Sequence, residues 1–319
     1  ERERAKEPAA PAPADEEDDD GADINGYHIE KKLGEGAFGM VFKARKNGQT
    51  YALKMQVIHD RSSAYVALSE LRLMLAVEHP CVVQAVDAFN MDGPQGSQLL
   101  FMAMEFCREG DLMSLIEKKK REGGRFDEHE VRGFMCQLAL GLAYLHEHNL
   151  IHRDIKPPNV FVVQGTRCIL GDLGIARLVD PQEFARTQAG TLLWMSPEIL
   201  SKRPYDFKTD VWSLGCVAHS LATLEVAPFL GDSEYAITDR IVRGQPRPEI
   251  PSAYSSEYRN LVDRMLKKNP TERISAEQIL RLPFMRHYVS PFVQAVLPTL
   301  EGARRETLRS QAAALGVRV

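Results

Sequence analysis

The densest group of residues able to do chemistry lies between Ile151 and Phe161, where the sequence is IHRDIKPPNVF. Asp154 can accept a proton from a hydroxyl nucleophile, Lys156 can neutralise charge on a moving phosphoryl group, and Asn159 can offer an amide oxygen to a divalent metal. The alternative interpretation is a polar turn after a helix, whose histidine and aspartate only cap backbone groups. Short matches such as HRD are common, so the flanking elements and the other motifs must decide.

The flanking segments predict the elements that would hold this stretch in place. Residues 127–130, DEHE, predict the capped start of a helix, because apolar residues at helical spacing follow them. On the other side, Val160–Val163 and Cys168–Leu170 predict a hairpin. Asp172 follows the second strand, in the sequence GDLG, and a carboxylate at that point can reach a metal held between phosphates.

A glycine-rich segment, Leu33–Val41, matches the pattern G-x-G-x-x-G-x-V. A dinucleotide-binding turn would have the same glycines but requires a helix to follow. Here Met40–Arg45 alternates like a strand and leads into Asn47-Gly48, which is a hairpin signal. We therefore expect a strand–turn–strand flap whose backbone N–H groups approach phosphates, with a plain flexible hairpin as the alternative.

Lys54 lies inside an apolar strand, where an unpaired buried charge would cost several kcal/mol. Glu70 is the expected partner, because Tyr65–Val77 predicts a helix. The alternative for Glu70 is a solvated position on that helix. We expect the apolar face of the helix to contain Leu68, Leu71 and Leu75, with Glu70 among them.

The order of elements predicts an α+β fold with two lobes. Strands are expected over Cys81–Phe89 and Leu99–Glu105, and the chain becomes mostly helical after a polar connector at 105–111. We expect a small antiparallel-sheet N-lobe with one helix over residues 27–105, and a larger, mainly helical C-lobe over 109–288. The boundary between two such lobes is where a nucleotide would lie.

Charge is distributed unevenly along the 319 residues, 44% of which are hydrophobic. Residues 1–22 hold nine acids and three bases, a net charge of −6, which leaves +2 for the remainder. We expect residues 1–26 to form a disordered acidic tail, because such a composition cannot bury a core. A C-terminal extension is expected over 289–319; its half-polar stripe would suit a packed helix, a partner-binding helix or part of a longer tail. The stripe consists of Leu300, Arg304, Thr307, Leu308, Gln311 and Leu315.

Composition also narrows the class of protein. No run of about 18 apolar residues occurs, so we expect neither a membrane span nor a signal peptide. No basic stripe indicates nucleic-acid binding. An odd number of scattered cysteines predicts reduced thiols in an intracellular protein. They are Cys81, Cys107, Cys136, Cys168 and Cys216.

Further downstream, the segment between Asp172 and Glu198 shows little periodicity and is long enough to suggest a functional loop. Asp210 is expected to cap the apolar helix that begins with DVWSLG. Arg273 is expected to pair with Glu198, as a structural rather than a catalytic contact.

These motifs, in this order, resemble a eukaryotic protein kinase of the serine/threonine type across residues 27–288. The resemblance implies a bilobal kinase fold and transfer of the γ-phosphoryl group of ATP, with Mg²⁺, to Ser or Thr hydroxyls of protein substrates. Protein kinases are the standard example of such catalysis by positioning and charge stabilisation. The series comprises GEGAFGMV, YALK, Glu70, HRDIKPPN, the DLG at Asp172, SPE, DVWSLG and Arg273.

The resemblance also implies roles for individual residues. Asp154 would be the catalytic base, Lys54 with Glu70 would hold the phosphates, and Asn159 and Asp172 would be the magnesium ligands. Met104 would be the gatekeeper before the hinge. The implied nucleotide-binding residues are Leu33, Gly34, Glu35, Gly36, Ala37, Phe38, Gly39, Met40, Val41, Ala52, Lys54, Met104, Glu105, Cys107, Asp111 and Phe161.

Within the kinases, the sequences HRDIKPPNVF, LGDLGIAR and ARTQAGT resemble the NEK, or NIMA-related, family. Lys156 is typical of serine/threonine kinases, Thr191 would line the substrate site, and Thr187 would be the activating phosphorylation site, with a solvated loop residue as the alternative. Residues 192–195, LLWM, depart from the family and leave the peptide preference open. Family analogy suggests cell-cycle, microtubule or ciliary roles, and a cytoplasmic location, with association with the cytoskeleton or a nuclear location as alternatives.

Two other interpretations stay open at this point. One is a serine/threonine kinase of another group, such as the polo-like or calcium/calmodulin-dependent type. The other is a pseudokinase that serves as a scaffold; such proteins usually lose Lys54, Asp154 or Asp172, and all three are present. The two tails are expected sites of partner binding.

Overall fold

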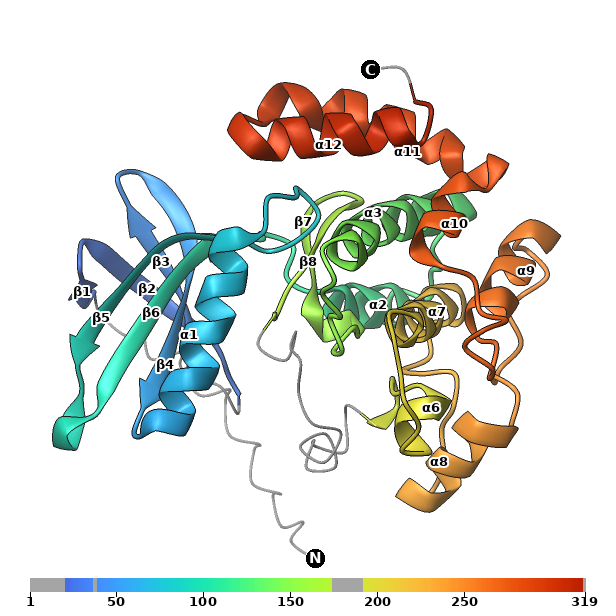
Figure 1. Ribbon diagram of the computed structural model, residues 1–319, viewed down its shortest axis with the longest axis horizontal. Helices are drawn as coiled ribbons and strands as arrows, with labels where there is room; N and C mark the ends of the chain where they lie inside the picture. The colour runs from blue at the N-terminus through green and yellow to red at the C-terminus, as the bar shows by residue number, and fades with distance from the viewer. Residues whose placement is uncertain (1–20, 37–38, 174–191, 318–319) are drawn as a thin grey trace, which may run out of the picture.

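A six-stranded antiparallel sheet forms most of the N-lobe in the computed structural model, which describes residues 21–36, 39–173 and 192–317 (Figure 1). The strand order is β1-β2-β3-β4-β6-β5, so consecutive strands are neighbours except where β6 lies between β4 and β5. The strands are β1 (Asp23–Ile24), β2 (Tyr27–Gly36), β3 (Gly39–Lys46), β4 (Gln49–Ile58), β5 (Ala85–Asp92) and β6 (Gln98–Glu105).

Two glycine positions fix the first hairpins. Asn47 and Gly48 have φ values of 50° and 77°, which is the twisted two-residue turn that the sequence predicts between β3 and β4. Gly39 has φ 126°, and a Cβ atom there would lie 1.9 Å from the carbonyl oxygen of Met55. Only glycine therefore lets β3 begin this close to β4.

Helix α1 (Arg61–Ala76) packs on the sheet through only part of the predicted face: Glu70 is buried and Leu71 is half-buried. Its buried residues are Ala67, Glu70 and Met74, whereas Leu68 and Leu75 are 49% and 52% exposed. Successive residues of a helix are about 100° apart around its axis. Because the stripe with Ala67, Glu70 and Met74 faces the sheet, the two leucines point away from it. The expectation for Leu68 and Leu75 was wrong because the contact with the sheet selects the stripe that carries Glu70.

Strand β5 begins later than the sequence predicted. Residues 81–83 instead contact β8 (Arg167–Leu170): Leu170 N donates to Cys81 O at 2.9 Å, and Val83 N donates to Leu170 O at 2.7 Å. Because β8 occupies these backbone groups, the segment cannot join the sheet until Ala85. The turn after α1 is thereby attached to the C-lobe.

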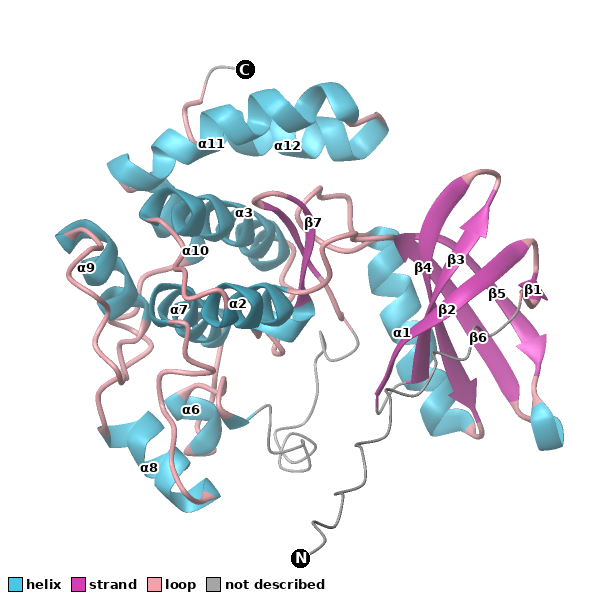
Figure 2. Ribbon diagram, turned by 180° about the vertical axis from the view of Figure 1, so that it is seen from behind, coloured by secondary structure: helices cyan, strands magenta, loops and turns pink. Residues whose placement is uncertain are grey.

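The C-lobe is built around two buried helices, α3 (Glu128–Glu147) and α7 (Lys208–Thr223) (Figure 2). Helix α3 begins with the predicted capping box, in which Asp127 and Glu130 bond reciprocally. Helix α7 is buried almost throughout, as expected for a helix apolar on all sides. The other elements are α2 (Leu112–Arg121), β7 (Val160–Gln164), α6 (Pro197–Leu200), α8 (Glu234–Arg243), α9 (Ser256–Met265) and α10 (Ala276–Arg281).

The C-terminal residues form two further helices against this lobe, α11 (Pro283–Val296) and α12 (Gly302–Ala314). The expected boundary at 288/289 falls inside α11. The half-polar stripe of α12 faces the protein, with Leu308 and Leu315 buried. None of the helices in the described ranges is long and apolar enough to cross a lipid bilayer.

Candidate active site

Lys54 on β4 holds the centre of the site, where elements of both lobes meet. Its Nζ lies 2.6 Å from Glu70 Oε1 on α1, so the predicted ion pair is present. The same Nζ lies 3.7 Å from Asp172 Oδ1, which follows β8. Gln56, which the sequence analysis did not identify, donates to the second oxygen of Glu70 at 2.6 Å. Glu70 thus has a donor at each oxygen, which fixes its carboxylate toward Lys54.

The loop between α3 and β7 brings Asp154, Lys156 and Asn159 together. Lys156 Nζ lies 2.8 Å from Asp154 Oδ2, and Asn159 Nδ2 donates to the same oxygen at 2.8 Å. Asn159 Nδ2 also donates to the backbone oxygen of Asp154 at 2.9 Å. Oδ1 of Asp154 is buried and has no hydrogen-bond partner among the described residues. That oxygen is therefore the one available to accept a proton.

Asp172 adopts a left-handed backbone conformation, with φ 56°. Non-glycine residues in this region carry strain and are concentrated at functional sites. The preceding Gly171 has no room for a side chain, since a Cβ atom there would lie 2.1 Å from the ring of Phe161. Nε2 of His152 lies 2.9 Å from the oxygen of Gly171. These contacts place the backbone that leads into Asp172 beside the Asp154 loop.

Asp210 has a different role from the one predicted. Helix α7 starts earlier, at Lys208, and Asp210 is 1% exposed inside it. Its Oδ1 accepts from the backbone N of Arg153 at 2.8 Å, and its Oδ2 accepts from that of His152 at 2.9 Å. Oδ2 also lies 2.9 Å from His146 Nε2. Asp210 is therefore a buried anchor of the Asp154 loop rather than a helix cap.

The surroundings of Asp210 favour its ionised form. Burial alone would raise the pKa of Asp210, but the hydrogen bond from His146, the charges of His146 and His152 and the backbone N–H of Arg153 together bring the pKa below its usual value. The ionised carboxylate can then accept both backbone N–H groups of the loop.

Two pairs of the predicted nucleotide-binding residues lie side by side. Ala52 and Met104 are cross-strand partners on β4 and β6. Asp111 and Phe161 form an isolated bridge, which brings the start of α2 to β7. Asp111 also caps α2 by accepting from Ser114 N at 2.8 Å, a second use that the sequence analysis missed. Ala37, Phe38, Thr187 and Thr191 lie outside the described residues.

Arg153 is a half-buried cation in the Asp154 loop. Its guanidinium lies over the ring of Tyr205, 5.3 Å from the centroid, and its buried Nε and Nη1 have no hydrogen-bond partner among the described residues. Partial burial lowers the pKa of Arg153 from its ordinary value. A half-buried guanidinium with two unused donors is suited to an anion.

A second ion pair lies deep in the C-lobe. Arg273 Nη1 and Nη2 donate to Glu198 Oε1 and Oε2 at 2.6 and 2.9 Å, as the sequence analysis expected. Arg273 also donates to the backbone oxygens of Lys267 and Lys208. This pair is part of the fold and lies apart from the residues predicted to do chemistry.

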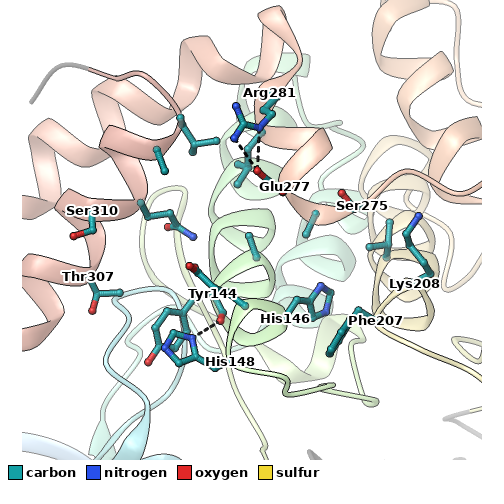
Figure 3. Close-up of a pocket in the computed structure, with 18 of the residues that line it drawn as sticks. Tyr144, His146, His148, Phe207, Lys208, Ser275, Glu277, Arg281, Thr307 and Ser310 are labelled. Carbon is teal, nitrogen blue, oxygen red and sulfur yellow. Dashed lines mark hydrogen bonds and ion pairs between the residues drawn. The ribbon is translucent and has the colours of Figure 1, made fainter.

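A cavity of about 780 Å³ lies elsewhere, between α3, α10 and α12 (Figure 3). Tyr144 of α3 and His148, which directly follows α3, lie across it from Thr307 and Ser310 of α12. None of the predicted site residues lines it.

Comparison with known families decides what this arrangement is. The family model of the protein kinase domain matches residues 27–285. The chain belongs to the protein kinase family. The match covers the N-lobe and the C-lobe as far as α11, and therefore every residue of the predicted site.

The relatives of this kinase domain include several Nek kinases. It is 36% identical over 274 residues to mouse serine/threonine-protein kinase Nek4, and this alignment covers 84% of the chain and 34% of Nek4. Mouse Nek5 is 34% identical over 269 residues, covering 84% of the chain and 42% of Nek5. Mouse Nek3 is 34% identical over 278 residues, covering 86% of the chain and 52% of Nek3. The resemblance to the NEK family is confirmed, and the chain spans about a third to a half of the length of these relatives.

Proposed function

We propose that this kinase domain transfers the γ-phosphoryl group of ATP to Ser or Thr hydroxyls of protein substrates. The observation that carries the proposal is the position of Lys54 Nζ, 2.6 Å from Glu70 and 3.7 Å from Asp172. One ammonium group is thereby shared between a carboxylate that fixes it and a second carboxylate at the metal position. Phosphoryl transfer relies on such fixed charges more than on covalent chemistry.

Asp154 is the proton acceptor in this proposal. As the substrate oxygen bonds to the γ-phosphorus, its proton passes to Asp154 Oδ1, and the bond to the β–γ bridging oxygen breaks to release ADP. Lys156 and Asn159 bind the other oxygen, Oδ2, which leaves Oδ1 to face the hydroxyl. Lys156 is also a positive charge close to the transferred group.

Mg²⁺ fits the oxygen donors of the site. The amide nitrogen of Asn159 is bound to Asp154, so its amide oxygen is the atom that remains for a cation, and Asp172 adds a carboxylate. Oxygen donors of these two kinds are the ones Mg²⁺ prefers. Bound there with the phosphates of ATP, the ion would neutralise their negative charge.

Activation-loop phosphorylation is the regulation that the site favours. A phosphate on Thr187 would bring a charge of about −1.5 to −2 and three acceptor oxygens. Arg153 supports this proposal, because its buried Nε and Nη1 have no partner among the described residues. We expect Thr187→Ala to lower activity in protein that has been allowed to autophosphorylate, measured with peptide phosphorylation; full activity in that variant would contradict the proposal.

The surroundings of the kinase domain are proposed on the sequence alone. We propose an acidic tail over 1–26, a kinase domain over 27–288 and an extension over 289–319, with partner binding through the two tails. The end of this tail, Asp23–Ile24, forms β1 and pairs with β2, so the expectation of disorder does not hold there, and the second boundary lies inside α11. A cytoplasmic location and a cell-cycle role stay predictions from family analogy.

The proposed reaction is tested with ATP, Mg²⁺ and a degenerate Ser/Thr peptide library, comparing wild type with Asp154→Asn. We expect phosphoserine and phosphothreonine from the wild type and a loss of transfer of roughly 10³-fold or more in the variant. Circular dichroism and ATP affinity should stay close to wild type. A pseudokinase scaffold would instead bind ATP without any transfer, even after phosphorylation of Thr187.

A further inference from the structure

The inner face of α12 contacts the turn that follows α1. Gln311 carries this contact with both ends of its amide: Oε1 lies 3.0 Å from Nε2 of His79, and Nε2 donates to the backbone oxygen of Leu140 on α3 at 3.0 Å. His79 is completely buried. A single polar side chain of the extension therefore joins α3 to the turn.

The hydrogen bonds fix the tautomer of His79. The backbone N of Cys81 donates to His79 Nδ1 at 3.1 Å, so Nδ1 is the acceptor and Nε2 carries the proton that Gln311 accepts. Burial lowers the pKa of His79 to about 4, partly opposed by the hydrogen bond to Gln311, so the ring is neutral at physiological pH. Both nitrogens of the ring are then used, and Gln311 is the partner of one of them.

One side of this turn leads to Glu70. Helix α1 ends at Ala76, three residues before His79. The backbone N of Glu78 donates to the hydroxyl of Tyr144 at 3.0 Å, and the His79 and Tyr144 rings stack with centroids 5.1 Å apart. The end of the helix that carries Glu70 is thus held from α3 and from α12.

The other side of the turn leads to Asp172. Cys81 O and Val83 N are both bonded to Leu170, at 2.9 and 2.7 Å, and Leu170 lies two residues before Asp172. The same short segment therefore connects the two elements that carry the acidic partners of Lys54. A shift of the turn would move both partners.

We propose that Gln311 is a positioning residue for phosphoryl transfer. It acts through His79 on the turn that follows α1 and contacts β8. The C-terminal helix thereby helps to keep Glu70 and Asp172 facing Lys54. This inference rests on the proposed function, because it deepens the account of the same site. It assigns a role to the half-polar stripe of α12 that packing alone does not require.

The sharpest test replaces Gln311 without changing its size. Gln311→Met keeps an unbranched side chain and helix propensity but removes both hydrogen bonds, and the cavity of Figure 3, which Gln311 also lines, leaves room for the sulfur. We expect kcat to fall roughly 3- to 10-fold and the Val83 amide to exchange hydrogen faster. Gln294→Met, the same change at an exposed position of α11, is the matched control and should alter neither.

Gln311→Glu supplies a second variant. It keeps an acceptor for His79 Nε2 but sets a carboxylate oxygen against the backbone oxygen of Leu140, which repels it, so we expect a fall in kcat at least as large as with methionine. It also covers the case in which the methionine variant does not fold. Wild-type kcat and wild-type Val83 exchange in both folded variants would overturn the inference, as would a fall in kcat with unchanged exchange.

These measurements separate the inference from the proposed function. If the wild type transfers no phosphate, the proposed function fails. Hydrogen exchange of the Val83 amide and the calorimetric affinity for ATP with Mg²⁺ can still be compared between the variants, and they report on the turn. If the wild type transfers phosphate and the methionine variant equals the Gln294→Met control in all three measurements, only the inference fails.

Discussion

The two lobes use buried ion pairs in different ways. Lys54 and Glu70 form a single contact, and Lys54 has Asp172 as a second acidic neighbour. Arg273 and Glu198 form a two-pronged contact in which the arginine side chain is 0% exposed, against 11% for that of Lys54. The first pair leaves an ammonium group able to bind phosphate, whereas the guanidinium of the second is bonded to Glu198 and to the backbone oxygens of Lys267 and Lys208.

This difference indicates which buried charge contributes to catalysis and which contributes to the stability of the fold. A buried pair is not in itself strongly stabilising, but the loss of one partner leaves an uncompensated charge. In the C-lobe pair, the remaining charge of Glu198 or Arg273 would be out of reach of solvent, because both side chains are buried. In the interlobe site, defined by Lys54, Glu70, Asp154, Asn159 and Asp172, a second partner remains. Substitutions should therefore affect stability in one region and catalysis in the other.

The largest expected effect is on stability. Arg273→Met leaves Glu198 buried without its two donors, so we expect the free energy of unfolding to fall by about 3–5 kcal/mol. Urea unfolding monitored by tryptophan fluorescence would measure it. A change below about 1 kcal/mol would mean that the C-lobe pair is not the structural contact described here.

Lys54→Met should lower activity much more than stability, the opposite of Arg273→Met. It removes the charge that faces the phosphates, so we expect kcat/KM to fall by roughly 10²- to 10³-fold. The midpoint of urea unfolding should stay closer to wild type than that of Arg273→Met. Equal losses of stability in the two variants would remove the distinction between the regions.

A smaller effect comes from buried histidines that are neutral rather than paired with a charge. Burial lowers the pKa values of His79 and His219 to about 4. Their unfolded pKa is about 6.5, so between pH 6.5 and 4 the unfolded chain binds more protons and stability falls as the pH falls. Each should contribute a loss of roughly 2 kcal/mol between pH 7 and 5.

His219→Gln tests this contribution. Glutamine keeps a donor for the oxygen of Pro248, which lies 2.8 Å from His219 Nε2, but cannot titrate. The difference in unfolding free energy between pH 7 and 5 should shrink by roughly 2 kcal/mol. An unchanged difference would show that His219 is not the titrating group.

The smallest expected effect belongs to an exposed pair. Arg309 and Glu306 lie 3.0 Å apart on α12, with side chains 50% and 64% exposed. Arg309→Ala should change the free energy of unfolding by less than about 0.5 kcal/mol and leave kcat unchanged. A larger loss of unfolding free energy would indicate that the geometry of an ion pair matters more than its burial. That result would contradict the comparison of the two buried pairs.

Local patterns predicted those features whose causes lie close together in the chain. The Asn47-Gly48 turn and the capping box at Asp127 follow from dihedral preference and from hydrogen bonds three residues apart. The Lys54–Glu70 pair could be predicted because a lone charge in an apolar strand requires a partner, and the Arg273–Glu198 pair could be predicted from the order of the segments in the chain. The kinase family followed from eight motifs in order.

What the sequence did not predict depends on contacts between distant segments. Leu68 and Leu75 look like core residues until the sheet selects the stripe that includes Glu70. Asp210 has the type and position of a helix cap, and only the packing of α7 below the catalytic loop shows its partners. Gln311 has no signal of its own, since its partner His79 lies 232 residues away.

The most direct test of this account measures kcat and thermal midpoint side by side for Glu70→Gln and Glu198→Gln. The two variants make the same chemical change to the acidic member of each pair. We expect Glu70→Gln to lose kcat by roughly 10- to 100-fold with a small change in midpoint. Glu198→Gln should have a much lower thermal midpoint of unfolding. At temperatures below that midpoint it should keep most of its kcat. A Glu70→Gln variant that transfers phosphate at the wild-type rate, or a Glu198→Gln variant that melts like the wild type, would contradict the account.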